Sequence, residues 1–236
     1  MSLLVRVRRK AFDEKPVLEG LEFDLGEREI VALVGPSGCG KTTLLKIIGG
    51  LDSDYDGTIG WPDGRAPRIG TIFQEPRLLP WRTVRQNLTL VLPPDAHAAA
   101  EELLRHLGLW SFRDSFPPTL SLGMARRVAI ARAFAIAPEL VLLDEPFVSL
   151  DPEMAQRSRD VLLEAWRERA TSVLLVTHDP VGAAALADRI LVLSPRPARI
   201  VAAIEVPAAQ RRGDRATALQ VAAQLEVAVG QHLARG

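Results

Sequence analysis

The sequence predicts an α/β fold in which helices flank a mostly parallel β-sheet. Short and continuously apolar runs such as Ile30–Val34 and Leu140–Leu143 have the length and composition of strands that are buried on both faces. Helix-forming segments alternate with these runs, as expected for a parallel sheet with helical connections. Strand patterns disappear between about residues 83 and 137, which predicts an all-helical insertion into the α/β domain.

The expected elements can be placed along the chain from hydrophobic periodicity and from start and stop residues. The expected strands are Ile30–Val34, Leu140–Leu143, Val173–Val176 and Ile190–Leu193. The expected helices are Lys41–Ile48, Ala96–Leu107, Gly123–Ile136, Pro152–Glu168 and Pro180–Ala187. Near the C-terminus one helical face carries Ala218, Val221, Ala222, Leu225, Ala228 and Val229, which predicts a last helix packed on the domain.

Length and composition narrow the range of functions. The chain has 236 residues, of which 47% are hydrophobic and 25% charged, as in ordinary globular proteins. Basic and acidic residues balance at 29 each, so we expect no nucleic-acid partner. Apolar runs stay far below the roughly 18 to 20 residues that span a bilayer, so any work at a membrane requires partners. The single cysteine, Cys39, excludes an internal disulfide and a cysteine-rich metal site.

A phosphate-binding loop follows the first expected buried strand. The chain from Gly35 to Thr42 matches the pattern G-x-x-x-x-G-K-[ST], and a helix-forming run follows it. Backbone N–H groups of such a loop close around phosphates, and the helix N-terminus adds partial positive charge. We expect Lys41 to reach the β- and γ-phosphates and the Thr42 hydroxyl to ligate Mg²⁺. The predicted ATP-binding residues of the loop are Gly35, Pro36, Ser37, Gly38, Cys39, Gly40, Lys41, Thr42 and Thr43.

Two acids end the apolar run that begins at Leu140. Because ligands bind at the carboxyl ends of strands in such sheets, Asp144 is expected to hold Mg²⁺ and Glu145 to act as the general base that polarises water. A strand that ends in acids can also lead into a turn and a helix cap. The phosphate-binding loop in the same chain favours the catalytic interpretation.

A third polar group follows another apolar run, at Thr177-His178-Asp179. His178 lies after a strand of the same expected sheet, where its ring could hydrogen-bond the γ-phosphate. Alternatively, this segment only caps the helix that begins at Pro180, through Thr177 or Asp179.

Together these motifs resemble those of ABC-transporter ATPases over nearly the whole chain. Phe73-Gln74-Glu75 is similar to the family's Q-loop, Leu120–Met124 to its signature motif and Ser149–Asp151 to its D-loop. His178 falls where the family has its switch histidine. Phe12 corresponds in position to an aromatic residue that stacks on adenine, although a core aromatic is the alternative at this position.

The resemblance implies a fold and a mechanism. The fold is a P-loop NTPase cassette with a mixed sheet, made of a RecA-like core and an N-terminal antiparallel β part. It is expected as one domain over residues 1–236, with the helical subdomain at about 83–137 inserted between the Q-loop and the acidic strand. Two cassettes form a head-to-tail homodimer in which Ser121, Gly123 and Met124 contact the nucleotide of the other subunit. Gln74 is implied to sense Mg²⁺ and the attacking water.

The signature motif departs from the family at Leu122, where glycine is usual. If this position needs a left-handed backbone, leucine costs roughly 1–2 kcal/mol. If the position is helical, leucine is tolerable because it is a good helix former. The first case leaves open a non-catalytic, ATP-gated assembly protein as an alternative to an ATPase.

The stretch from Arg77 to Leu88 resembles that of nitrate, sulfonate and taurine importer ATPases. This resemblance implies a peripheral subunit on the cytoplasmic side of the inner membrane, working with a separate permease and a solute-binding protein. The Trp81 region is then expected to receive a permease helix in a groove, whereas the alternative is that Leu78, Leu79 and Trp81 pack inside the insertion. The motor of an exporter or of a non-transport assembly system also remains open.

Overall fold

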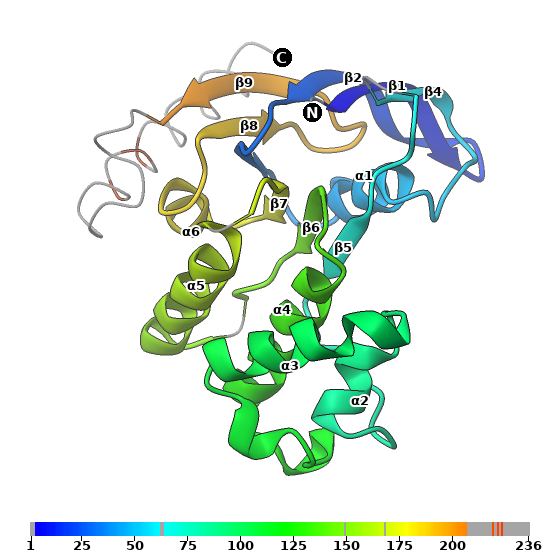
Figure 1. Cartoon of the computed structure of the whole chain (residues 1–236). Coiled ribbons are helices and arrows are strands. Elements are labelled where there is room, and N and C mark those ends of the chain that lie inside the picture. The colour runs from blue at the N-terminus through cyan, green and yellow to red at the C-terminus, as the bar shows by residue number, and fades with distance from the viewer. Residues whose placement is uncertain are drawn as a thin grey trace. The chain divides into compact units, whose positions relative to one another are not determined.

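The computed structural model describes residues 3–61, 64–148, 150–167 and 169–206 together with positions 219, 221 and 223. These residues divide into two compact units (Figure 1). The first unit contains the described residues up to Ala66 and from Ser172 onward, and the second contains Pro67–Thr171. Of the positions that predicted a C-terminal helix, only Val221 lies among the described residues, and the others lie outside them.

A mixed four-stranded sheet forms part of the first unit. Its strands are β3 (Ile30–Val34), β7 (Ser172–Thr177), β8 (Arg189–Leu193) and β9 (Ile200–Glu205). Their order is β7-β3-β8-β9, and only the pairing of β8 with β9 is antiparallel. All five residues of β3 are buried, which explains its continuously apolar sequence. Helix α1 (Lys41–Ile48) follows β3, and helix α6 (Pro180–Ala184) lies between β7 and β8 in the chain.

A three-stranded antiparallel sheet completes the first unit. It consists of β1 (Leu3–Phe12), β2 (Lys15–Leu25) and β4 (Asp56–Gly60), with β1 in the middle (Figure 1). In β1, buried Leu3, Val5 and Val7 alternate with exposed residues, so this sheet has one core face and one solvent face. The expected N-terminal antiparallel part is therefore present.

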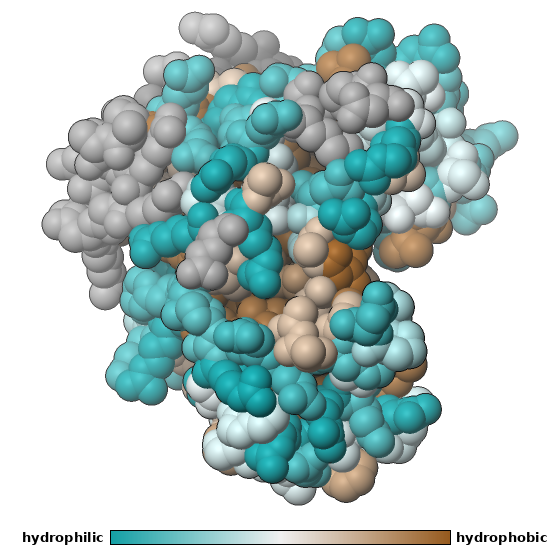
Figure 2. Space-filling view, in the orientation of Figure 1, coloured by the Kyte–Doolittle hydropathy of each residue, from teal (hydrophilic) through white to brown (hydrophobic). Residues whose placement is uncertain are grey.

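The second unit combines two parallel strands with the helical segment. The strands are β5 (Ile69–Ile72) and β6 (Leu140–Asp144). The helices are α2 (Val84–Thr89), α3 (His97–His106), α4 (Leu122–Ala135) and α5 (Pro152–Arg167), with short 3₁₀ turns at Pro94–Ala96, Trp110–Phe112 and Pro117–Thr119. Between β5 and β6 the described residues contain no strand. The face of α2 to α4 seen in Figure 2 is mostly hydrophilic.

Most expected elements occur within one or two residues of their predicted bounds. The helix expected over Pro180–Ala187 is an exception, because α6 ends at Ala184. The chain must leave the helix early for Asp188, whose carboxylate accepts from the Ile30 N–H at 2.8 Å and fixes the start of β8 against β3. Among the described residues, every helix is too short or too polar to cross a bilayer.

Candidate nucleotide-binding site

The loop between β3 and α1 has the shape of a phosphate cradle. Gly38 and Gly40 have backbone φ angles of 76° and 126°, which residues other than glycine rarely adopt. A Cβ atom added at Gly40 would also lie 2.7 Å from Leu18 Cδ2, and one added at Gly35 would lie 2.9 Å from Leu193 Cβ. These glycines therefore let the loop turn tightly against its neighbours, as the sequence pattern predicts.

Helix α1 begins at Lys41 without a side-chain cap, because its N-cap residue is Gly40. Its first-turn N–H groups and partial positive charge are thus directed into the loop, which favours an anion there. The Lys41 side chain is 6% exposed, and its Nζ donates to the carbonyls of Gly35 at 2.8 Å and Pro36 at 3.1 Å. The lysine ammonium is therefore held over the loop. Burial raises the pKa of the Cys39 thiol, so this cysteine stays protonated and apolar.

His178 lies beside this loop within the first unit. It directly follows β7, whose Thr177 carbonyl accepts from the Gly35 N–H at 3.4 Å, and its side chain is exposed. The capping alternative is also seen, because the Asp179 carboxylate accepts from the Val181 N–H at 3.0 Å at the start of α6. The cap of α6 is therefore formed by Asp179, the residue after His178.

Phe12 also belongs to the first unit and is half exposed, so the alternative of a core aromatic is wrong. It is the last residue of β1 and pairs with Lys15 across the hairpin. Two residues further along β2, Val17 packs against the loop, since a Cβ added at Gly40 would lie 2.9 Å from Val17 Cγ1. The hairpin that carries Phe12 therefore contacts the phosphate-binding loop.

The two acids lie in the second unit, at the end of β6. Asp144 and Glu145 are both partly exposed. Glu145 has a φ angle of 48°, and a non-glycine residue in this left-handed region costs roughly 1–2 kcal/mol. Such strain is concentrated at functional sites, where surrounding contacts hold the residue in place. Its carbonyl accepts from the Val148 N–H at 3.3 Å, which closes a turn immediately after the strand.

The signature motif forms the N-terminus of α4 in the same unit. Ser121 is the N-cap, and its hydroxyl accepts from the Met124 N–H at 3.3 Å. Leu122 is the first helical residue and lacks a positive φ, so the left-handed interpretation of this position is wrong. Its side chain is 48% exposed, and Gly123 is partly exposed. Leucine therefore neither strains this turn nor fills a core position.

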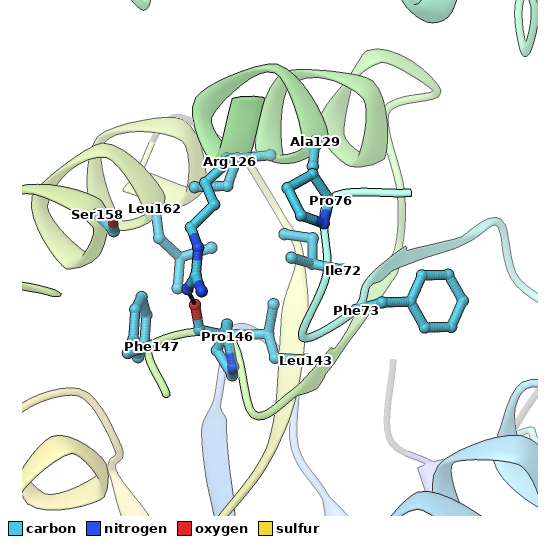
Figure 3. A pocket seen from close by; sticks show the side chains of 11 residues that line it. Ile72, Phe73, Pro76, Arg126, Ala129, Leu143, Pro146, Phe147, Ser158 and Leu162 are labelled. Carbon is cyan, nitrogen blue, oxygen red and sulfur yellow. Dashed lines mark hydrogen bonds between the residues drawn. The ribbon is translucent and has the colours of Figure 1, made fainter. Parts of the chain in front are cut away.

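Two arginines of α4, which sequence reasoning missed, join this helix to neighbouring loops. Arg126 is 8% exposed and donates to the carbonyls of Pro146 and, at 3.1 Å, Val148, next to Glu145 (Figure 3). Arg132 donates to the carbonyls of Arg77 at 2.8 Å and Pro76 at 3.1 Å, just after Gln74. Burial lowers the pKa of both guanidinium groups. No sequence signal marks such contacts, because their acceptors are backbone carbonyls.

Arg126 lines a small cavity together with residues of β5, β6 and α5, among them Ile72, Leu143 and Leu162 (Figure 3). The centre of a water molecule could occupy a volume of about 10 Å³ in this cavity, which is enough for one water at most. Arg126 Nε has no hydrogen-bond partner among the described residues. The cavity therefore suits a structural water rather than a substrate.

The segment between Gln74 and α2 exposes a large aromatic side chain. Gln74 is exposed, and Trp81 is 68% exposed, so the alternative in which Trp81 packs inside the insertion is wrong. Asn87, whose structural role the sequence did not indicate, is fully buried and holds the segment in place. Its side chain accepts from the Leu79 N–H at 2.8 Å and donates to the carbonyls of Leu79, Arg82 and Thr83 at 3.0 to 3.2 Å.

The predicted site residues fall into two sets. Phe12, the loop residues 35–43 and His178 belong to the first unit, and Gln74, Ser121, Gly123, Met124, Asp144 and Glu145 belong to the second. Within the described residues, no group of three or more acidic, histidine or cysteine side chains could hold a metal ion by itself. The hydroxyl of Thr42 and the carboxylate of Asp144 are hard oxygen donors, as Mg²⁺ prefers. Mg²⁺ at a nucleotide usually takes only one or two ligands from the protein, because phosphates and waters supply the others.

Comparison with known proteins gives a consistent result. A family model described as ABC transporter matches residues 18–148. An aliphatic sulfonates import ATP-binding protein, SsuB 2 of Burkholderia lata, is 41% identical, with 92% of this chain and 82% of that protein covered. SsuB 1 of Pseudomonas aeruginosa is 45% identical, with 89% of each chain covered. SsuB of Bacillus subtilis is 43% identical, with 85% of this chain and 83% of that protein covered.

Solved structures agree with these sequence relatives. An ATP-binding subunit of an ABC transporter superposes with a TM-score of 0.74 at 27% identity, covering 87% of this chain and 90% of that one. A dimeric ATP-binding cassette in a post-hydrolysis state, bound to ADP and Pi, superposes with a TM-score of 0.73 at 27% identity. That match covers 88% of this chain and all of the other.

Proposed function

This chain belongs to the ABC transporter family, and from that membership we propose that it is the ATP-hydrolysing subunit of an importer for aliphatic sulfonates. Three relatives that are 41% to 45% identical carry out ATP binding in aliphatic sulfonate import, according to their names. The alternatives of an exporter motor or a non-transport assembly ATPase have no support among these relatives.

The geometry of the phosphate-binding loop is the observation that carries the ATP-binding role. Its backbone is closed by glycines at positions where side chains would collide, and Lys41 is buried over it. In this proposal the N–H groups of the loop and the first turn of α1 bind the β- and γ-phosphates, and Lys41 neutralises their charge. Phe12 stacks on the adenine, and His178 hydrogen-bonds the γ-phosphate.

Mg²⁺ bound with ATP would neutralise charge on the phosphate oxygens. Thr42 and Asp144 would hold the ion through their side-chain oxygens, and Gln74 would contact the ion and the attacking water. Glu145 accepts a proton from that water as the general base. Its left-handed backbone conformation supports this role, because strain at a polar residue at a strand end is typical of a functional position.

The cassette acts as a head-to-tail homodimer in this proposal. Ser121, Gly123 and Met124 at the start of α4 contact the γ-phosphate bound by the other copy. The position of these residues at the N-terminus of α4 supports this contact, because the partial positive charge of a helix N-terminus favours an anion. ATP then stabilises the closed dimer through contacts that ADP lacks, and hydrolysis reopens it.

The permease contacts the segment that contains Trp81. Exposed aromatic side chains held on a fixed backbone are typical anchors of protein interfaces, and Asn87 fixes this backbone. A helix of the permease packs on Trp81, which follows Gln74 by seven residues in the sequence, so the state of the nucleotide reaches the membrane subunits. The chain therefore works as a peripheral subunit on the cytoplasmic side of the inner membrane, with a separate solute-binding protein.

Glu145→Gln tests the catalytic assignment. Because glutamine keeps the shape of the side chain but cannot accept the proton, ATP turnover is expected to fall by at least about 100-fold. The dissociation constant of ATP is expected to stay within about threefold. Phosphate release and calorimetric titration measure the two quantities. Glu22→Gln is the matched control, since Glu22 is an exposed partner of Arg6; near-normal turnover in Glu145→Gln would remove Glu145 as the base.

A further inference from the structure

Lys10 is a buried lysine in the middle strand of the antiparallel sheet. Strand β1 alternates buried and exposed residues up to Val7, and its register with β4 then shifts between Val7 and Arg9. This irregularity turns Lys10 rather than Arg9 inward, so that Lys10 is only 2% exposed. A buried ammonium group is costly unless it is paired and hydrogen-bonded.

The Lys10 ammonium is anchored to the loop that follows α1. Its Nζ donates to Asp52 Oδ1 at 2.9 Å, to the Asp54 carbonyl at 2.6 Å and to Asp54 Oδ2 at 3.3 Å. Asp52 is tied to the end of α1, since its N–H donates to the Lys46 carbonyl at 3.2 Å. Burial by itself lowers the pKa of Lys10, but the hydrogen bonds to the two aspartates outweigh it and raise the pKa. Lys10 therefore remains charged and fixed in position.

The Phe12 ring packs against this fixed cation. Lys10 Nζ lies 4.5 Å from the centroid of the ring, which is within the range of a cation–π contact. Phe12 is nevertheless 50% exposed. Its backbone is fixed by the tight turn that follows, in which Asp13 and Glu14 have φ angles of 47° and 64° between β1 and β2. The ring is thus held by a cation and still offers surface to a ligand.

We propose that Lys10 is a positioning residue that holds Phe12 as a stacking platform for the adenine base of ATP. Two physical effects support this role. An anchored ring loses little freedom when a base stacks on it. A cation at the ring also draws its π-electrons toward itself, which lessens their repulsion with the π-electrons of a stacked base. The inference rests on the proposed role of Phe12 in ATP binding and adds a determinant of affinity for the base.

A purely structural role of Lys10 predicts different behaviour. If Lys10 only stabilises the sheet, its removal lowers the affinity for every ligand of the phosphate-binding loop to the same degree. If Lys10 acts through Phe12, its removal lowers the affinity for ligands that carry a base. The affinity for inorganic tripolyphosphate, which has no base, then stays unchanged. The contrast between ATP and tripolyphosphate therefore separates the two roles.

The experiment is a double-mutant cycle with Lys10→Met and Phe12→Ala, read by calorimetric titration of the full chain with ATP and with inorganic tripolyphosphate. Phe12→Ala is expected to weaken ATP binding about 10-fold, in line with base–aromatic stacking. Lys10→Met is expected to weaken ATP binding about 3-fold to 10-fold. Both variants are expected to bind tripolyphosphate within about twofold of the wild type. In the Phe12→Ala background, Lys10→Met is expected to weaken ATP binding further by less than about twofold.

Two outcomes overturn the role of Lys10 alone. One is an equal loss of affinity for ATP and tripolyphosphate in Lys10→Met, and the other is a full effect of Lys10→Met that persists in the Phe12→Ala background. Unchanged ATP affinity in Phe12→Ala overturns the proposed stacking as well. Lys41→Ala tests the phosphate-binding loop separately, because it is expected to lower the affinity for both ATP and tripolyphosphate. If Lys10→Met does not fold, Lys10→Gln keeps hydrogen-bond donors for Asp52 and Asp54 without the charge, and the same criteria apply.

Discussion

Leu122 begins α4 with ordinary helical backbone, and nearly half of its side chain is exposed. At such a position the usual glycine of the signature motif has no conformational advantage, because no left-handed angle is required. The proposed contact with a phosphate needs a backbone N–H at the start of a helix, and leucine supplies it as well as glycine does. The sequence departure therefore does not by itself indicate a disabled ATPase.

Leu122→Gly is accordingly expected to leave ATP turnover within about twofold of the wild type. Its free energy of unfolding is expected to fall by no more than about 1 kcal/mol, since glycine is a poor helix former. Phosphate release and urea denaturation measure these effects. Leu122→Ala serves as the control that removes bulk but keeps helix propensity. A rise in turnover of more than about 10-fold in the glycine variant alone would contradict this view of the motif.

Strand β5 and helix α4 approach each other closely at a single glycine. A Cβ atom added at Gly70 would lie 2.5 Å from the carbonyl oxygen of Ala133, so even a methyl group forces the two elements apart. Gly70 has no positive φ, so its requirement is steric rather than conformational. Glycine within a strand often marks such a close approach of backbones.

Gly70→Ala is expected to lower the free energy of unfolding by roughly 1–3 kcal/mol, as overpacking does. Gly60→Ala in β4 is the matched control, because a Cβ added there would lie 3.6 Å from Leu4 Cβ, an ordinary contact. Urea denaturation followed by circular dichroism compares the two variants. Equal stability of both would show that β5 and α4 can separate without cost.

At the scale of the whole molecule, ATP is expected to control the association of two chains. Glu145→Gln traps bound ATP in this view, so the variant is expected to change from a monomer of 25.8 kDa to twice that mass when MgATP is added. Light scattering after size exclusion measures the mass, and MgADP is the control ligand. A mass that stays at the monomer value with saturating MgATP would contradict association of isolated chains through ATP.

Much of this molecule could be predicted from the sequence, and the reasons are physical. Buried strands such as β3 are continuously apolar, and the phosphate-binding loop has glycines where other residues collide, so both leave local patterns. The relatives confirm the family that these patterns indicated. Lys10 could not be placed, because a shift in strand register turned it inward. The partners of Arg126 were equally hidden, since carbonyl oxygens occur at every residue.

The two α4 arginines have a consequence for the conditions under which this protein works. Arg126 and Arg132 hold their loops through carbonyl oxygens, which carry no net charge and take up no proton in the range where carboxylates do. Acidification and added salt weaken exposed ion pairs such as Arg8–Asp56, but they leave such carbonyl contacts largely intact. The connections of α4 to its two loops are therefore expected to tolerate changes in pH and ionic strength.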